Sequence, residues 1–176
     1  MQAKVEGKVQ IMLVRLSFSY NFANCFQQNY LLCIGGFVMD KKKIVIVCAD
    51  FNDEITSVML ETALQRAKEK QLDVIEVVKV PGSYDIPYAV KKVLMESVEK
   101  KIDGIITLGA VIQGDTEHDV IVAENCARKC TDLSVEFNIP IALGVIGPRV
   151  TWENADKRKE EYAVRAVDAV KMLIDI

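Results

Sequence analysis

Residues 109–119 read Gly-Ala-Val-Ile-Gln-Gly-Asp-Thr-Glu-His-Asp, and they follow the apolar run 102–108. This order predicts a buried strand, a polar turn over 109–117 and a helix that begins near His118. Ligands of open α/β sheets bind where the parallel strands end. His118 is the only histidine in the chain, and imidazole titrates near neutral pH. His118 is therefore a candidate for proton transfer.

The same alternation of strand and helix patterns continues on both sides of this stretch. Strands are expected at 44–49, 74–80, 102–108 and 141–146, and helices at about 55–70, 87–98, 118–133 and 152–174. The expected helical core stripes include Leu64, Val98 and Leu173. Strictly alternating elements predict one three-layer α/β domain, a four-stranded parallel sheet with helices on both faces. The turns at 50–53, 81–85, 109–118 and 147–151 should then share one edge of the sheet.

Composition restricts the function classes. The chain has 176 residues, a net charge of −3 and 51% hydrophobic residues. The mild acidity argues against nucleic acid or an anionic membrane as a partner, and no apolar run approaches the roughly 20 residues that span a bilayer. Five cysteines without paired spacing argue against a secreted disulfide framework. We therefore expect a cytoplasmic protein in which Cys48, Cys126 and Cys130 are small buried hydrophobic residues.

Residues 1–38 differ from the rest, with one acidic residue, three basic residues and no helical or strand period. A transit peptide is one interpretation. A disordered extension is another, and a start codon assigned too far upstream, with Met39 as the true start, is the interpretation we favour. We expect the folded domain to occupy 39–176 in each case.

Residues 109–116 have the glycine spacing of a phosphate-binding loop, but Asp115 stands where a nucleoside triphosphatase needs lysine. The backbone amides of Gly114, Asp115 and Thr116 could still bind a smaller phosphate at a helix N-terminus. An ordinary glycine turn is the alternative.

A metal site is not expected. His118 and Cys126 are eight residues apart, about 12 Å along a helix, which is too far to share one ion. Phe51 lies among Asp50, Asn52 and Asp53. It could stack on a flat ring or close the core.

Three segments, 51–56, 80–87 and 109–118, together resemble the 6,7-dimethyl-8-ribityllumazine synthase family of riboflavin biosynthesis, most closely its archaeal branch. The resemblance covers essentially 40–174 and implies a flavodoxin-like fold. The family condenses 5-amino-6-(D-ribitylamino)uracil with 3,4-dihydroxy-2-butanone 4-phosphate, and phosphate leaves. No cofactor or metal is implied.

The resemblance also implies residue roles. Phe51 would stack on the pyrimidine, and His118 would move protons. The ribityl chain would be held by Ser83, Tyr84 and Asp85. The heterocycle would contact Ala110, Val111 and Ile112, and phosphate would be bound by Gly114, Asp115 and Thr116.

Two further residues would come from a neighbouring subunit: Leu143, where many relatives carry Phe, and Arg158, which would clamp the phosphate. Lys157 and Arg149 are alternatives to Arg158. The resemblance implies a homo-oligomer, either a pentamer or an icosahedral capsid of twelve pentamers. Rival functions are an archaeal-type riboflavin synthase, a non-catalytic lumazine or flavin carrier, and a shell protein with a decayed site.

Overall fold

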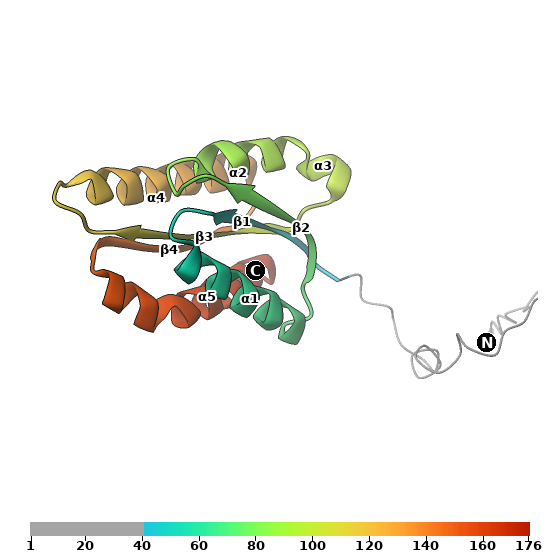
Figure 1. Cartoon of the computed structure of the whole chain (residues 1–176). Helices are drawn as coiled ribbons and strands as arrows, with labels where there is room; N and C mark the ends of the chain where they lie inside the picture. Colours follow the sequence, from blue (N-terminus) through green and yellow to red (C-terminus); the bar gives the residue numbers. More distant parts are fainter. Residues whose placement is uncertain (1–40) are drawn as a thin grey trace, which may run out of the picture. The chain divides into compact units, whose positions relative to one another are not determined.

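Four parallel strands form the centre of the structure, a computed structural model that describes residues 41–176 (Figure 1). The expected extension over 1–38 lies outside the described residues. The elements, in chain order, are β1 (Lys43–Ala49), α1 (Asp53–Glu69), β2 (Asp73–Val80), α2 (Ile86–Met95), α3 (Ser97–Lys100), β3 (Gly104–Ile112), α4 (His118–Phe137), β4 (Ile141–Val150) and α5 (Trp152–Ile174). The three-layer flavodoxin-like α/β fold is confirmed.

The central strand β1 is buried on both faces. Its residues Ile44, Ile46 and Cys48 pack in one core, which α1 and α5 cover. Val45 and Val47 point the other way, into a core covered by α2 and α4. Figure 1 shows these two helix layers on opposite sides of the sheet. Burial on both faces explains why the strand is apolar throughout instead of alternating with polar residues.

The strand order is β2-β1-β3-β4, and every pairing is parallel. The chain leaves β1 for a strand on one side, and β3 adds on the other side. The carboxyl ends of β1 and β3 therefore flank the switch point where such sheets bind ligands. The sequence predicted a shared edge for the strand-to-helix turns, which is confirmed, but it did not predict the strand order.

Two strands run further than predicted. The expected turn at Gly109 is strand, because β3 continues to Ile112 while pairing with β4. β4 likewise continues past Gly147 and Pro148 to Val150. β4 is an edge strand, and a proline is tolerated there, especially beside a register irregularity such as the one opposite Ala110–Ile112.

The structure has five helices among the described residues, where four were predicted. The helix expected at 87–98 ends at Met95, and a short α3 follows. Val98 is consequently 91% exposed and does not continue the core stripe of α2. Ile102, which follows α3, is buried in that core instead. Leu64 and Leu173 are also exposed, so their assignment to the core was wrong.

Other expectations are confirmed. The last helix has the predicted bounds, and Cys48, Cys126 and Cys130 are buried free thiols. Burial raises the pKa of the Cys48 thiol, which keeps it protonated and inert. Within 41–176, no helix is both long and apolar enough to cross a membrane.

Candidate active site

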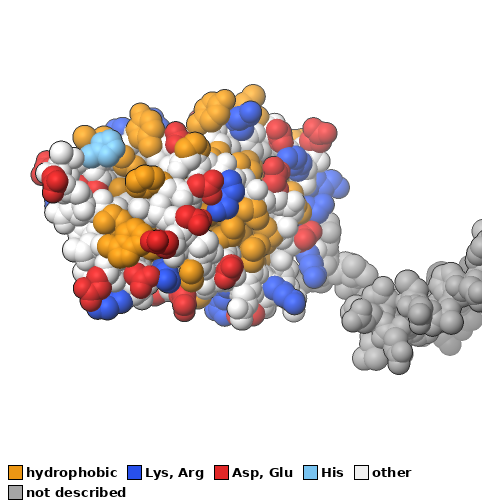
Figure 2. All heavy atoms as spheres, viewed as in Figure 1, with side chains coloured by type: hydrophobic (Ala, Val, Ile, Leu, Met, Phe, Trp, Pro, Cys, Tyr) orange, Lys and Arg blue, Asp and Glu red, His pale blue; other side chains and the backbone are white. Residues whose placement is uncertain are grey.

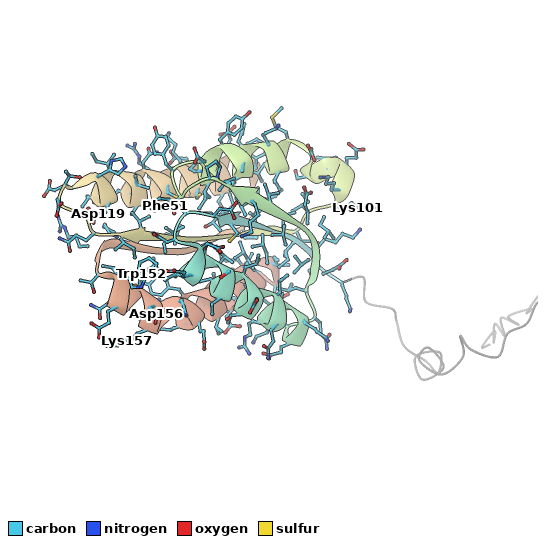
Figure 3. All side chains as sticks on the ribbon, viewed as in Figure 1. Phe51, Lys101, Asp119, Trp152, Asp156 and Lys157 are labelled. Carbon is cyan, nitrogen blue, oxygen red and sulfur yellow. The ribbon has the colours of Figure 1, made fainter. Side chains whose placement is uncertain are left out.

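A cavity of about 390 Å³ opens at the carboxyl end of the sheet, next to the β1–β3 switch point. This volume lies within the range of small-molecule sites. Its lining is Phe51, Gly82, Ser83, Tyr84, Ala110, Val111, Ile112, Gly114, Thr116, His118, Asp119 and Val122. Figure 3 shows Phe51 and Asp119 at this end of the domain, while Lys101 lies at the opposite end.

Phe51 follows β1 and is held by its backbone. Its N–H donates to the carbonyl of Pro81 over 3.0 Å, which ties the exit of β1 to the exit of β2. The ring itself is 69% exposed. The core-plug alternative for Phe51 is therefore wrong, and the ring is available for stacking on a flat ligand.

Asn52 is a site residue that the sequence reasoning missed. Its backbone is left-handed (φ 61°), and its side-chain Nδ2 donates to the carbonyl of Ala110 over 2.8 Å. Asn is one of the few residues that adopts this conformation readily. An Asn between a strand and a helix is the sequence signal for such a turn, but its long-range partner is not readable there.

Ser83 lies against β3 because Gly109 leaves room for it. A Cβ at Gly109 would stand 2.5 Å from Ser83 Oγ, so no other residue fits without displacing the hydroxyl. Gly109 therefore serves a close approach inside a strand rather than a turn. This approach brings the turn after β2 to the strand that lines the cavity.

The segment between β3 and α4 carries the candidate anion site. Gly114 and Thr116 line the cavity, and α4 begins at His118 as predicted. A Cβ on Gly114 would meet nothing within 4 Å, so this glycine is not required by packing and leaves its backbone open to a ligand. The free N–H groups of a helix's first turn favour anions.

His118 is exposed at the rim of the cavity. Figure 2 shows the histidine at the surface beside hydrophobic side chains. Its position next to the segment 114–116 allows it to exchange protons with a ligand bound there.

Asp119 is the second residue that the sequence reasoning missed. It lines the cavity but is only 4% exposed, and its Oδ2 accepts a 2.8 Å hydrogen bond from the backbone N–H of Arg149. An acidic residue in a helix's first turn is an ordinary sequence feature. Its burial could not be read from the sequence because its partner lies 30 residues away.

Two expected site residues of the same turns lie outside the cavity lining. Asp85 Oδ2 accepts from the Gly82 N–H over 3.0 Å, and Asp85 faces a separate groove beside β2 and α2. Asp115 is exposed and does not line the cavity.

The residues expected from a neighbouring subunit also lie away from this chain's own cavity. Leu143, on the edge strand β4, is half exposed. Arg158 pairs with Glu161 over 3.4 Å, and its guanidinium lies 4.9 Å from the Tyr162 ring. The alternative Lys157 pairs with Glu153 over 2.6 Å. Within 41–176, no group of three His, Cys, Asp or Glu is placed to hold a metal ion.

Comparisons with known proteins point to one family. The family model described as 6,7-dimethyl-8-ribityllumazine synthase matches residues 41–176. Proteins of that name from Saccharolobus islandicus (strain L.S.2.15) and Saccharolobus solfataricus are 51% and 49% identical over 132 residues, which cover 75% of this chain and 84% of each relative. The one from Sulfolobus acidocaldarius is 50% identical over 139 residues, covering 78% of this chain and 86% of the relative.

Proposed function

The chain belongs to the 6,7-dimethyl-8-ribityllumazine synthase family, transferases of riboflavin biosynthesis, and we propose that it condenses 5-amino-6-(D-ribitylamino)uracil with 3,4-dihydroxy-2-butanone 4-phosphate. The observation that carries this proposal is the cavity, which brings an aromatic ring, an apolar strand edge, a helix N-terminus and the only histidine together. Imine formation, loss of phosphate, ring closure and dehydration would follow in that order.

The heterocycle would lie between Phe51 and the edge of β3. The exposed Phe51 ring offers a face for stacking. Ala110, Val111 and Ile112 line the same cavity and offer apolar side chains and backbone groups. Asn52 supports this arrangement because its hydrogen bond to Ala110 joins the two walls.

The ribityl chain would lie along the turn after β2. Ser83 and Tyr84 line the cavity and carry hydroxyls that can both donate and accept hydrogen bonds. Asp85 gives one oxygen to the Gly82 N–H and retains another for a ribityl hydroxyl. Its place outside the cavity lining makes it the most peripheral of the three.

The phosphate would bind at the N-terminus of α4. Gly114 and Thr116 line the cavity there, and the backbone N–H of Asp115 would contribute without its carboxylate. A phosphate dianion needs a compensating cation, and arginine supplies bidentate hydrogen bonds as well as charge. We assign this role to Arg158 of a neighbouring copy, since this chain's own Arg158 does not line the cavity.

His118 would move the protons. Formation of the imine and elimination of phosphate each need a proton to be taken or given near neutral pH. His118 lines the same cavity as Gly114 and Thr116 and begins α4, so it could serve the leaving phosphate and the amine in succession.

A site shared between copies requires a homo-oligomer, for which we propose a pentamer or a shell of twelve pentamers. Large apolar side chains are exposed at the cavity, in the groove beside β2 and α2, and on or just after the edge strand β4, and a second copy would cover them: Phe51, Tyr84, Tyr88, Leu143 and Trp152. In a closed ring, every such surface is covered by a neighbouring copy.

We propose the cytoplasm as the location of the protein. The three free thiols that are buried among residues 41–176 fit its reducing conditions.

The test offers the purified full-length chain the substrates of each candidate function in separate reactions. A lumazine synthase forms lumazine from the two substrates and leaves added lumazine unchanged. A riboflavin synthase would convert added lumazine to riboflavin. A carrier or a decayed shell protein would form no product from either mixture, and either of these last two results would contradict the proposal.

A further inference from the structure

The end of β4 follows an unusual path beside the cavity. Gly147 (φ 121°) and Arg149 (φ 59°) both have left-handed backbones. For Arg149, which has a Cβ, this conformation is unfavourable and must be held by its surroundings. The segment Gly147–Val150 therefore needs contacts that fix it.

This segment supports the cavity-lining edge of β3. A Cβ on Gly147 would stand 2.6 Å from the carbonyl oxygen of Val111, so the two backbones are in close contact. The Val150 carbonyl then accepts from the N–H of Gln113 over 2.9 Å. A shift of the segment would be transmitted to Val111 and Gln113, on either side of Ile112.

Asp119 fastens the same segment to α4. Its carboxylate accepts from the Arg149 N–H over 2.8 Å and is almost wholly buried. A buried carboxylate loses its hydration and needs hydrogen bonds in return. The Arg149 N–H and the N-terminal end of α4 provide that compensation.

We infer that Asp119 is a positioning residue for the reaction. Its hydrogen bond to Arg149 fixes the first turn of α4, which carries His118, relative to the β3 edge that would hold the heterocycle. His118 is the neighbouring residue on the chain, so a displacement of Asp119 moves the imidazole as well. Asp119 acts by holding the His118 imidazole and the β3 edge in place, and not through the charge of its carboxylate.

Two conservative substitutions separate position from charge. Asp119→Asn keeps an acceptor oxygen at the same place and removes the charge. Asp119→Glu keeps the charge but adds a methylene, which moves the oxygens away from the Arg149 N–H. A positioning role predicts that Asn preserves the function and Glu impairs it, whereas a direct electrostatic role predicts the reverse.

The experiment measures kcat and KM for both substrates with the full-length oligomer, and this readout rests on the proposed function. We expect Asp119→Asn to stay within about 3-fold of wild-type kcat and Asp119→Glu to lose about 10- to 100-fold, because misplacement by an ångström has effects of that size. Saturating concentrations of both substrates should not restore the turnover rate of the Asp119→Glu variant, because the defect lies in kcat. The control Asp132→Asn, at an exposed position on the same helix, should match wild type.

Amide hydrogen exchange of the peptide that contains Arg149 provides a readout independent of turnover. Protection should be retained in Asp119→Asn and lost in Asp119→Glu. If wild type does not turn over while exchange follows this order, the proposed function fails but the positioning contact stands. Equal activity of both variants, a more active Glu variant, or an Asn variant that fails to fold would overturn the inference.

Discussion

The side-chain Nδ2 of Asn52 donates a 2.8 Å hydrogen bond to the carbonyl of Ala110, which joins the exit of β1 to the cavity-lining end of β3. The bond crosses the switch point of the sheet, and Phe51 precedes Asn52 directly. Asn52 thus fixes the distance between the two surfaces that we propose hold the heterocycle.

Replacing Asn52 should weaken binding of the pyrimidine substrate. Asn52→Gly removes the donor but tolerates the left-handed backbone, so it isolates the hydrogen bond. We expect a several-fold rise in KM for the pyrimidine and a loss of about 1–3 kcal/mol in the free energy of unfolding, because the Ala110 carbonyl loses its partner. Steady-state kinetics and urea unfolding measure both effects.

Asn52→Ala is the matched comparison. It loses the same donor and also has to hold a Cβ at φ 61°, which costs roughly 1 kcal/mol more. If the Gly variant showed wild-type KM and stability, the bond between Asn52 and Ala110 would have no role in the site.

His118→Ala should lower kcat by about 10-fold or more, at the low end of general acid–base effects because solvent and phosphate can also carry protons. Oligomer size and product affinity should hardly change, since the side chain is exposed. Stopped-flow kinetics and light scattering measure these quantities. An unchanged kcat would remove His118 from the mechanism, and dissociation into monomers would show a structural role instead.

Arg158→Ala should raise KM for the ketone phosphate about 10-fold or more and leave KM for the pyrimidine nearly unchanged, because a charge-assisted contact to phosphate is lost. Arg165→Ala is the matched control. Arg165 also pairs with Glu161 and lies over the Tyr162 ring, so it shares the contacts that Arg158 makes within its own chain.

Equal effects of the two arginine substitutions would show that Arg158 acts through Glu161 and Tyr162 alone. Lys157 and Arg149 would then be the next candidates for the clamp. Mixed oligomers of Arg158→Ala and Phe51→Ala chains should regain activity, because some sites receive both intact residues. Verified mixed rings without recovery would contradict a shared site.

The contact between α1 and α5 should make stability depend on pH in the acid range. Arg66 hydrogen-bonds both carboxylate oxygens of Asp168 over 2.9 Å, which lowers the pKa of Asp168 below its usual value. A carboxyl whose pKa is lower in the folded state stabilises the fold above its unfolded pKa of about 3.9. That stabilisation is lost as pH falls through the folded pKa.

Asp168→Asn should therefore be less stable than wild type above about pH 5, and the two stability curves should converge below about pH 3. Denaturant unfolding across this range measures the difference. Asp156→Asn, exposed on the same helix and paired within 41–176 with the nearby Lys159 alone, should follow wild type throughout. A constant gap between Asp168→Asn and wild type at all pH values would disprove the linkage.

Periodicity alone predicted the fold class because each element carries its own signal. The apolar run 44–49 and the helix of residues 152–174 were predicted almost to the residue. The ends of β3 and β4 were not, since Gly109 and the pair Gly147-Pro148 are local turn signals. Contacts between distant segments override those signals. Ser83 packs against Gly109, and β4 pairs with β3 along its length.

The residues of the candidate site also fall into two groups, those whose position the local sequence predicts and those whose position depends on distant partners. Residues whose position follows from the end of a strand, such as Phe51, Val111 and His118, meet in the cavity as expected. Asn52 and Asp119 were missed as site residues because their roles depend on backbone partners far along the chain. The role that we propose for Arg158 depends on a second chain, so neither sequence periodicity nor one chain's geometry tests it.

The central claim, that this chain builds lumazine, is tested most directly by quantifying lumazine and inorganic phosphate together over a time course with both substrates. We predict that the two products accumulate in equal amounts, that neither forms when the pyrimidine is omitted, and that combining Phe51→Ala with His118→Ala lowers the rate of both by more than about 10-fold. Phosphate release without lumazine, or no turnover by the correctly assembled wild-type chain, would contradict the account.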